Sequence, residues 1–402
     1  MTAGPRRTLI LTWSAMGGAM QRAAYVTGLG VCLPNSPVAN DEVEQVLGRL
    51  STQSAAVKRR ALMNNGIKSR HYAIDPDTGN MTHSNVEMTA EAIRAACNGS
   101  GASLAEIECL VCGTSSPDQL IPSHASMVHA ALDCPPCEVV STSGVCCSGV
   151  SAFKYGYLNV AGGLCDRAVV TGSDLASPIM RASHFEPQLQ ADPKASEKPR
   201  ILDFGNEFLR WMLSDGAGAL VIADRESRNG PSLRIDWVDL VSFANRSEVC
   251  MYLGMRKIEA GAPETYRTVD DGTELLAGGF MSLAQDVGIL ADLLPKLMKS
   301  AIRQTFGKHN MAPDAVDWLL PHYSSEWFRQ PLYDGLVDLD LEIPFDRWFT
   351  NLSSKGNTGA ASIYIMLEEL VASGKAKTGH RILCMVPESA RMTFGFIYLT
   401  VV

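Results

Sequence analysis

The stretch Glu138-Val-Val-Ser-Thr-Ser-Gly-Val-Cys-Cys-Ser-Gly-Val-Ser-Ala-Phe153 decides the fold class. A β-branched run ends in small residues, two cysteines follow, and apolar residues then recur at helical spacing at Val150, Tyr157 and Val160. This pattern predicts a buried strand that turns into an amphipathic helix. The small residues around Cys147 let a second backbone segment or a bound molecule come close to the turn.

Short apolar runs alternate with helical patterns on both sides of this stretch. Strands are predicted at residues 23–30, 109–112, 168–171, 219–222, 318–320 and 382–385, and helices at residues 84–98, 123–132, 148–162, 283–306 and 358–373. Such alternation is typical of an α/β protein. No apolar run reaches the roughly 18 residues that a membrane-spanning helix needs.

The length of the chain indicates more than one packed unit. It has 402 residues, whereas a single core usually stops growing near roughly 250–300 residues. The charged segment Arg225–Pro231 follows a complete strand and ends in Gly-Pro, so we expect an N-terminal half at residues 22–230 and a C-terminal half at residues 231–402. Residues 1–21 are interpreted as a disordered extension, and residues 186–199, with three prolines, as a surface insertion.

The composition excludes several classes of function. Hydrophobic residues make up 46% and charged residues 19% of the chain, as in an ordinary globular protein. The net charge is −8 and no block of Lys and Arg occurs, so nucleic-acid binding is not expected. Arg6-Arg7 and the apolar residues after them loosely resemble a secretion signal, but Thr and Ser interrupt the run.

Eleven cysteines are spread along the chain, mostly in apolar stretches where a free thiol packs as a small hydrophobe. An odd number in a large chain is not typical of a disulfide scaffold, which indicates a reducing cytoplasm. The segment Cys134-Pro-Pro-Cys137 resembles a redox pair, but it follows a helix rather than opening one. A plain loop is the favoured interpretation.

Cys147 is the candidate nucleophile. Its predicted place at a helix N-terminus exposes the thiol to the positive end of the helix dipole, which lowers a thiol pKa and raises the thiolate fraction. The alternative is that Cys146 and Cys147 are both inert core thiols. The strand-to-helix setting alone leaves this alternative open.

A thiolate nucleophile needs a partner that moves or stabilises charge, and His322 is the candidate. It directly follows the apolar run Val316–Pro321, and ligand crevices form at the carboxyl ends of α/β strands. A structural role is the alternative for this histidine. Asn357 lies in the turn Gly356-Asn-Thr-Gly-Ala-Ala361 before a predicted helix, where it could cap that helix or donate its amide to a thioester carbonyl.

Together, and in this order, these segments resemble β-ketoacyl-acyl carrier protein synthase III and its relatives in the thiolase superfamily. The resemblance runs from about residue 22 to residue 402 and rests on Gly66–His71, Cys147-Ser-Gly149, Thr171-Gly-Ser-Asp174, Ser214-Asp-Gly-Ala-Gly-Ala219, Pro321-His322 and Gly356-Asn-Thr-Gly-Ala-Ala-Ser362. Each segment alone is weak evidence, but the combination is specific.

The resemblance implies a five-layer αβαβα fold made of two similar halves, usually in a homodimer. It implies that Cys147 takes an acyl group from a thioester and that a carbanion from a second thioester attacks this acyl-enzyme. His322 and Asn357 would hydrogen-bond the thioester oxygen, and the backbone N–H groups of Cys147 and Ala390 would form the oxyanion hole. Acyl-coenzyme A or acyl carrier protein thioesters are the implied partners, and no cofactor and no metal ligands are expected.

The chain departs from the family pattern near the site. The loop Pro387–Gly395 replaces a glycine-rich loop and contains Glu388, which could act as a base or form a loop contact. Ile121 stands where many relatives have an aromatic residue that closes the partner subunit's acyl pocket, so primers longer than acetyl are expected. Trp327 replaces a family arginine, and the cluster Lys58-Arg-Arg60 could contact a phosphate of the donor or form a solvated helix face.

The segments at residues 69–79 and 208–216 resemble ketosynthases that fuse two acyl chains into dialkylresorcinol or cyclohexanedione precursors. The leading hypothesis is therefore a carbon–carbon-forming condensing enzyme. The alternatives are an acyltransferase on the same fold, with a hydroxyl or amine as acceptor, and a non-catalytic partner subunit of a ketosynthase heterodimer. A degradative thiolase is disfavoured, because Cys384 lies in a predicted strand rather than in a second catalytic loop.

Overall fold

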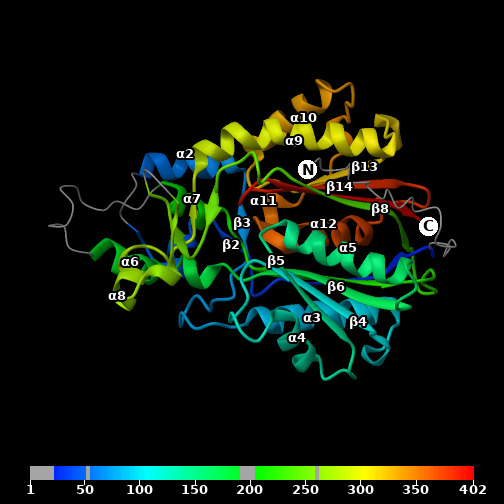
Figure 1. Ribbon diagram of the computed structural model, residues 1–402, viewed down its shortest axis with the longest axis horizontal. Coiled ribbons are helices and arrows are strands. Elements are labelled where there is room, and N and C mark those ends of the chain that lie inside the picture. The colour runs from blue at the N-terminus through cyan, green and yellow to red at the C-terminus, as the bar shows by residue number, and fades with distance from the viewer. Residues whose placement is uncertain (1–21, 51–54, 191–203, 259–261) are drawn as a thin grey trace, which may run out of the picture.

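The computed structural model describes residues 22–50, 55–190, 204–258 and 262–402. The predicted extension at residues 1–21 and residues 191–199 of the predicted insertion lie outside these ranges. The described chain forms five layers in the order helix, sheet, helix, sheet, helix, which Figure 1 shows from bottom to top. The predicted α/β class and its five-layer arrangement are therefore confirmed.

Hydrogen bonds join nine strands in the order β13-β14-β15-β8-β1-β7-β6-β4-β5. Their bounds are β1 (Tyr25–Cys32), β4 (Cys109–Thr114), β5 (Glu138–Ser143), β6 (Arg167–Asp174), β7 (Gly216–Ala223), β8 (Leu233–Ser242), β13 (Trp318–Pro321), β14 (Arg381–Glu388) and β15 (Thr393–Val401). β1 and β8 meet only where Tyr25 pairs with Arg234 and Val26 with Leu233. The ladder is therefore two smaller sheets linked at one corner.

The two smaller sheets repeat one arrangement of strands. In the first, β1 pairs antiparallel with β7, β7 antiparallel with β6, and β6 parallel with β4. In the second, β8 pairs antiparallel with β15, β15 antiparallel with β14, and β14 parallel with β13. The division into residues 22–230 and 231–402 remains our proposal, and this repeat supports it because residue 230 lies between β7 and β8.

Three helical layers enclose the two sheets. One outer layer contains α3 (Asn85–Ser100) and α4 (His124–Leu132), and the other contains α9 (Val287–His309) and α10 (Arg329–Val337). The middle layer, between the sheets, contains α5 (Cys147–Ala161) and α12 (Ser362–Ala372) (Figure 1). In the ranges that the structure describes, no helix combines the length and the apolar character needed to cross a membrane.

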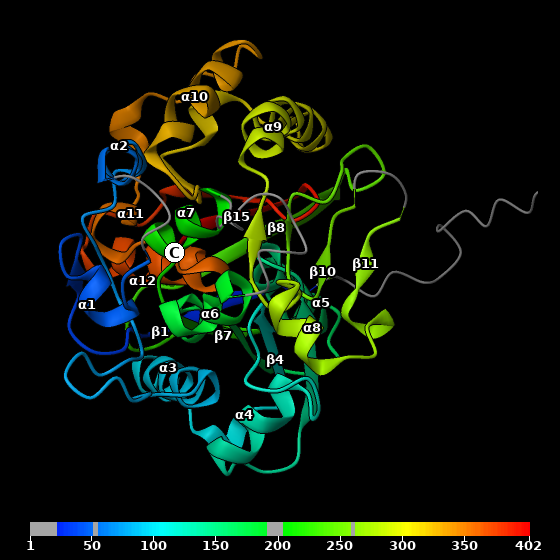
Figure 2. The same cartoon turned by 90° about the vertical axis from the view of Figure 1, so that its left-hand side faces the viewer.

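Shorter elements complete the chain, and Figure 2 views the molecule from the side on which α6 and α8 lie. The short helices and strands are β2 (Val38–Ala39), α1 (Val43–Leu47), α2 (Ala55–Asn65), β3 (Ser69–Arg70), α6 (Ala182–Gln190), α7 (Phe204–Met212), β9 (Met251–Tyr252), β10 (Met255–Arg256), β11 (Glu264–Thr265), α8 (Gly272–Ala277), β12 (Ala284–Gln285) and α11 (Leu352–Lys355). The 3-10 turns are η2 (Leu104–Glu106), η3 (Ser177–Met180), η5 (Tyr266–Thr268), η6 (Pro313–Ala315), η7 (Glu326–Phe328), η8 (Phe345–Arg347) and η9 (Gly359–Ala361).

The predicted elements correspond closely to the observed ones. The six predicted strands overlap β1, β4, β6, β7, β13 and β14, and the five predicted helices correspond to α3, α4, α5, α9, and η9 with α12. The helix predicted at residues 283–306 begins late, because the Asp286 side chain accepts the N–H of Ile289 at 2.9 Å and caps α9. Ala284 and Gln285 pair instead with β9.

Close backbone contacts hold the middle layer against β6. Gly149 on α5 and Gly172 on β6 both face Ala360, and a Cβ at Gly149 would lie 2.5 Å from the Ala360 carbonyl oxygen. Since only glycine permits this approach, η9 packs directly on α5 and β6. The turn that carries Asn357 is thereby held next to the helix start that carries Cys147.

Candidate active site

The start of α5 is a tight turn that follows β5. Gly144 takes a φ of +145°, which favours glycine, and Cys146 is the N-cap residue of the helix that begins at Cys147. The Thr142 hydroxyl donates to the Ser148 carbonyl oxygen at 2.8 Å and ties the turn to the end of the strand. Two adjacent cysteines therefore occupy one helix N-terminus.

The Cys147 thiol is buried against β14 and β15. It donates to the Val386 carbonyl oxygen at 3.2 Å and to the Thr393 carbonyl oxygen at 3.7 Å. Burial, the Glu388 carboxylate and Cys146 raise the pKa of this thiol well above its usual range. The prediction of a lowered pKa from the helix dipole is wrong for this resting state, because the loss of water around the sulfur outweighs the dipole. The sulfur is therefore protonated here.

A cavity of about 760 Å³ lies next to this helix start. Pockets for small molecules usually measure roughly 300–1,000 Å³, so this one is large enough for a substrate. Cys146, His322 and Asn357 belong to its wall, whereas Cys147, the next residue along α5, does not line it. Apolar side chains form much of the rest of the wall, namely Ile179, Met212, Leu213, Val249, Met251, Leu253, Leu283 and Leu294.

Glu388 reaches from the end of β14 to the start of α5. Its Oε2 accepts the backbone N–H of Val145 at 3.2 Å and that of Cys147 at 3.3 Å. These donors lie at the positive end of the helix, so they form a small anion-binding site that the chain fills with its own carboxylate. Burial raises the pKa of Glu388 more than the two N–H bonds lower it.

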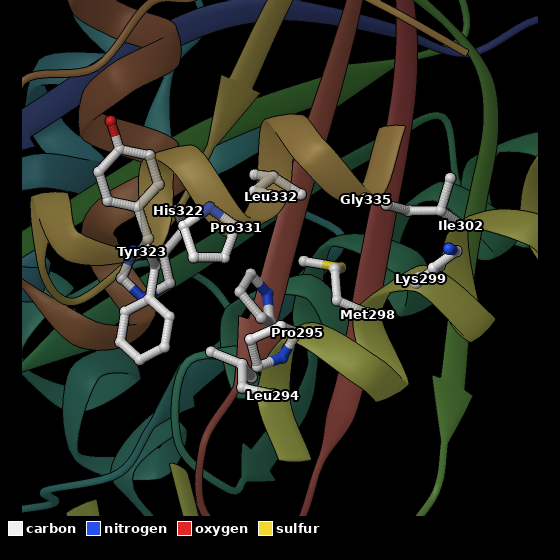
Figure 3. Close-up of a pocket in the computed structure, with 12 residues that line it drawn as sticks. Leu294, Pro295, Met298, Lys299, Ile302, His322, Tyr323, Pro331, Leu332 and Gly335 are labelled. Atoms are coloured by element: carbon white, nitrogen blue, oxygen red, sulfur yellow. The ribbon is translucent and has the colours of Figure 1, made fainter. Parts of the chain in front are cut away.

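His322 directly follows β13, as the sequence predicts, and its backbone N–H donates to the Met385 carbonyl oxygen at 2.8 Å. The side chain also borders a second, small pocket between α9 and α10, lined by Leu294, Met298 and Leu332 among others (Figure 3). This pocket of about 20 Å³ has room for little more than one water molecule. Burial lowers the pKa of His322 to about 4. The imidazole is therefore neutral at pH 7 and can donate one N–H.

Asn357 lies in the turn between α11 and η9. Its N–H donates to the Met212 carbonyl oxygen at 3.0 Å, and its carbonyl oxygen accepts the N–H of Ser214 at 2.9 Å. Its Oδ1 accepts the N–H of Gly359 at 3.0 Å, which stabilises the local turn. Since Oδ1 is engaged, the Nδ2 amide is the group that a bound carbonyl can use. The structural and the functional interpretation of this asparagine are therefore compatible.

Asp174, at the end of β6, connects three segments around the cavity. Its Oδ1 accepts the backbone N–H and the hydroxyl of Ser115 at 2.8 and 2.7 Å, and its Oδ2 accepts the N–H of Ala360 at 2.7 Å. Burial raises its pKa against the effect of these bonds. In the sequence, this aspartate stands out only as part of the segment Thr171-Gly-Ser-Asp174 that resembles the family. A single acid at the end of an apolar run is the signal that could have singled it out.

The remaining predicted site residues lie farther from this centre. Ala390 lies in the turn after Glu388, and its carbonyl oxygen accepts the N–H of Cys250 at 2.8 Å. Its neighbour Ser389 belongs to the cavity wall. Ile121 is 88% exposed and has no part in the wall that this chain alone provides.

The basic cluster on α2 and Trp327 are surface features. Lys58 forms an ion pair with Glu44 at 2.7 Å, and Arg59 and Arg60 are exposed. Trp327 is half exposed in η7. In this chain the cluster forms a solvated helix face, which leaves its two arginines accessible to a phosphate group.

Comparisons with known proteins agree with this architecture. The family described as 3-Oxoacyl-[acyl-carrier-protein (ACP)] synthase III C terminal matches residues 306–389. A beta-ketoacyl-[acyl-carrier-protein] synthase III of Allorhizobium ampelinum is 27% identical over 366 residues, which cover 90% of this chain and 94% of that protein. A protein of the same name from Ruegeria sp. is 26% identical over 364 residues, which cover 90% of this chain and 95% of that protein.

Solved structures share the fold along nearly the whole chain. AbyA1, a tetronic acid condensing enzyme, superposes with a TM-score of 0.72 at 20% identity and covers 94% of this chain and 99% of its own. A variant of Xanthomonas campestris OleA superposes with a TM-score of 0.71 at 18% identity and covers 96% and 99%. FabH from Pseudomonas aeruginosa superposes with a TM-score of 0.66 at 21% identity and covers 94% and 98%.

Proposed function

We propose that this chain, a β-ketoacyl-acyl carrier protein synthase III-like condensing enzyme, is a ketosynthase that joins two acyl thioesters by a Claisen-type condensation. The observation that carries the proposal is one large cavity whose wall includes His322 and Asn357 and which borders the double-cysteine start of α5. The named relatives support the same class of reaction. Cys147 is the proposed nucleophile, and the enzyme acts as an acyltransferase in forming the acyl-Cys147 intermediate.

In the first half-reaction, the Cys147 sulfur takes an acyl group from a coenzyme A or carrier-protein thioester. Since burial keeps this thiol protonated, its proton must leave as the sulfur attacks. The Glu388 carboxylate is our proposed acceptor, because it lies beside Cys147 and burial raises its own pKa. The sulfur then bonds to the carbonyl carbon, the bond between that carbon and the donor sulfur breaks, and Glu388 passes its proton to the departing donor thiolate.

The proton transfer from Cys147 also loosens the resting contact of Glu388. A neutral carboxyl group accepts the N–H bonds of Val145 and Cys147 more weakly than a carboxylate does. When Glu388 turns away, the Cys147 N–H becomes available to the oxygen of the tetrahedral intermediate, and one such donor is worth roughly 10²–10³ in rate. The N–H of Ala390 remains our proposed second donor.

In the second half-reaction, His322 and Asn357 hold the carbonyl oxygen of the other thioester. The neutral imidazole donates its N–H and the asparagine donates its Nδ2 amide, so both stabilise the negative charge of the enolate. The α-carbon of this thioester gives a proton to the Glu388 carboxylate, which forms the enolate. The enolate carbon then bonds to the acyl carbon, the carbon–sulfur bond to Cys147 breaks, and Glu388 returns its proton to the departing sulfur.

The shape of the cavity supports acyl groups longer than acetyl. Its volume of about 760 Å³ and its many aliphatic and methionine side chains suit an alkyl chain rather than a two-carbon unit. The small Ile121 side chain at the proposed subunit contact leaves the same space open. A dialkylresorcinol-type or cyclohexanedione-type product is our specific proposal, and fatty acid biosynthesis is the broader setting.

A homodimer is part of the proposal. β5 is the last strand of the sheet and its residues are partly exposed, so its outer edge is open to pairing in the described chain. Large apolar side chains are exposed nearby: Tyr155 donates to Glu138 of β5, and Leu158 follows on the same helix. Pairing of two β5 strands would bring Ile121 of one subunit toward the other subunit's cavity.

We also propose which thioesters donate the acyl group and in which cellular compartment the protein works. The exposed Arg59 and Arg60 of α2 are candidates to contact the phosphate of coenzyme A or of a carrier-protein arm. All eleven cysteines are free thiols, which supports a reducing cytoplasm.

Intact-protein mass spectrometry after incubation with a panel of acyl thioesters tests the proposal. Wild type should gain the mass of one acyl group and Cys147→Ala should gain none, whereas Cys146→Ala should still be acylated. If acylation persists in Cys147→Ala and disappears in Cys146→Ala, the nucleophile is Cys146, which lines the cavity.

The mass and carbon connectivity of the final product separate condensation from transfer to a hydroxyl or amine. A chain that is never acylated would be a non-catalytic partner subunit.

A further inference from the structure

Three soft metal-ligating side chains gather at the start of β5, at the opposite end of that strand from Cys147. His129, Cys134 and Cys137 each offer a ligand atom, and these atoms lie within 4.8 Å of one another. Within the described ranges, this is the one such group of three or more histidine, cysteine or acidic residues. In the sequence they are spaced His-x4-Cys-x2-Cys, and Cys-x2-Cys is a frequent half of a zinc site.

We propose that His129, Cys134 and Cys137 bind a zinc ion at a site separate from the condensation chemistry. Two thiolates and one imidazole form a ligand set that zinc prefers among the common divalent metals. The cluster is partly exposed, so a water molecule can complete a four-coordinate site. The site is independent of the proposed function, because none of its residues lines the catalytic cavity.

The distances fit this proposal. In a tetrahedral site with Zn–S near 2.3 Å and Zn–N near 2.0 Å, ligand atoms lie roughly 3.5–3.8 Å from one another. The observed upper bound of 4.8 Å exceeds this by about 1 Å, which a small rotation of exposed side chains covers.

The His129 ring already contacts the loop that carries the two cysteines. Its Nε2 lies 3.1 Å from the Pro135 carbonyl oxygen. Since a carbonyl only accepts, Nε2 must carry the proton, which leaves the lone pair of Nδ1 for a metal. A metal-binding histidine usually donates its second N–H to such an acceptor, and this bond fixes the tautomer. The acceptor comes from the same short loop that carries Cys134 and Cys137.

The backbone of this loop is restricted before any ion binds. Asp133 takes the left-handed conformation, with a φ of 52°, and ends α4, so the chain turns back toward His129. Pro135 and Pro136 then limit the conformations between the two cysteines. A ligand set that is held in place loses little conformational freedom when it binds a metal.

Binding would also change the protonation of the loop. Burial raises the pKa of Cys134, and it raises that of Cys137 to about 11, so both are thiols without a metal. Coordination requires thiolates, so zinc binding releases protons and weakens as the pH falls. The bound ion would join the end of α4 to the start of β5, two elements whose other ends lead to Ile121 and Cys147.

Metal analysis of the full chain, produced without a histidine tag or chelator, tests the proposal. We expect about one zinc per chain in wild type and almost none in the Cys134→Ser, Cys137→Ser double variant. Cobalt(II) added to the apoprotein should give thiolate-to-metal absorption bands that the double variant lacks. His129→Ala should hold cobalt more weakly, whereas Cys165→Ser, which changes a thiol outside the cluster, should bind it as wild type does. Acylation of Cys147 reports that every variant is folded.

Two results would overturn the proposal. One is wild-type protein that takes up neither zinc nor cobalt while its thiols are reduced. The other is equal metal content in wild type and the double variant, which would place the metal elsewhere. Loss of metal should also lower the melting temperature of wild type but not that of the double variant.

Discussion

The Oε2 atom of Glu388 lies 3.3 Å from the backbone nitrogen of Cys147 and accepts its N–H. Burial is the largest cause of the raised pKa of the Cys147 thiol, and the charge of the Glu388 carboxylate is the second largest. One side chain therefore acts on both the protonation of the proposed nucleophile and the N–H that would stabilise its oxyanion. The mechanism that we propose needs Glu388 in two positions, one before and one after the thiol loses its proton.

Replacing Glu388 with glutamine separates these effects. A nearby negative charge disfavours a thiolate, so its removal lowers the pKa of Cys147. We expect alkylation of Cys147 by iodoacetamide, followed by peptide mapping, to begin at a lower pH in Glu388→Gln. Acylation by a thioester should nevertheless slow by roughly 10²-fold or more, because the proton acceptor is gone. Glu106→Gln, on the surface, should change neither reaction, and equal acylation rates for Glu388→Gln and wild type would contradict the proposed role.

His322→Ala and Asn357→Ala should affect the second half-reaction selectively. The first half-reaction depends on the thiol and the oxyanion site, so both variants should still gain one acyl group in the mass spectrum. Condensation should fall by roughly 10²–10³-fold in each, because each loses one donor to the enolate oxygen. Single-turnover measurements that start from the isolated acyl-enzyme would show this directly. Equal losses in both half-reactions would indicate a general structural role instead.

The positions of His322 and Asn357 could be predicted because local pattern determines them. An apolar run ends directly before the histidine, and a glycine-rich turn surrounds the asparagine. The local pattern alone does not distinguish Cys146 from Cys147, because the difference depends on which sulfur faces β14 and β15. Those strands lie more than 230 residues farther along the chain.

Long-range packing also explains the wrong prediction about the pKa of Cys147. The helix dipole is a local feature that the sequence reveals, whereas burial and the Glu388 carboxylate come from a distant segment. Packing also brings together the proposed metal ligands at the start of β5, which the local sequence pattern reveals only in part. Cys134 and Cys137 are visible as a sequence motif, but His129 joins them only because Asp133 turns the chain at the end of α4.

Asp174→Ala should lower stability and condensation together. The substitution leaves the N–H groups of Ser115 and Ala360 without their acceptor, and each unsatisfied buried donor costs about 1–3 kcal/mol. Urea denaturation should therefore show a loss of about 2–6 kcal/mol in the free energy of unfolding. Asp166→Ala, at an exposed ion pair, is the control and should change stability by less than about 1 kcal/mol. A stable but inactive Asp174→Ala would point to a direct chemical role.

Ile121→Phe tests the proposed contact between subunits. A bulkier side chain at this position should narrow the neighbouring subunit's acyl cavity, so long acyl thioesters should lose acylation rate relative to acetyl thioester. Competition between acetyl and octanoyl thioesters measures this ratio within one sample. Met63→Phe, at an exposed position far from Ile121 in the sequence, on α2, should leave the ratio unchanged. An unchanged ratio in Ile121→Phe would contradict the proposal that Ile121 borders the neighbouring subunit's acyl cavity. A monomer by light scattering would contradict it as well.

The pH dependence of stability should report the burial of His322. Its pKa is lowered to about 4 by burial in the folded chain, whereas an unfolded histidine titrates near roughly 6.5. Between these pH values the unfolded chain binds more protons at His322 than the folded chain does. The contribution of this histidine to the free energy of unfolding is therefore lost as the pH falls from about 6.5 toward 4. The free energy of unfolding of wild type relative to His322→Asn should therefore fall by at most about 1.4 kcal/mol per pH unit in this window and stay constant above pH 7. His83→Asn, at a partly exposed position, controls for general effects of replacing a histidine. A difference between wild type and His322→Asn that does not change with pH would mean that water reaches the imidazole in the folded protein.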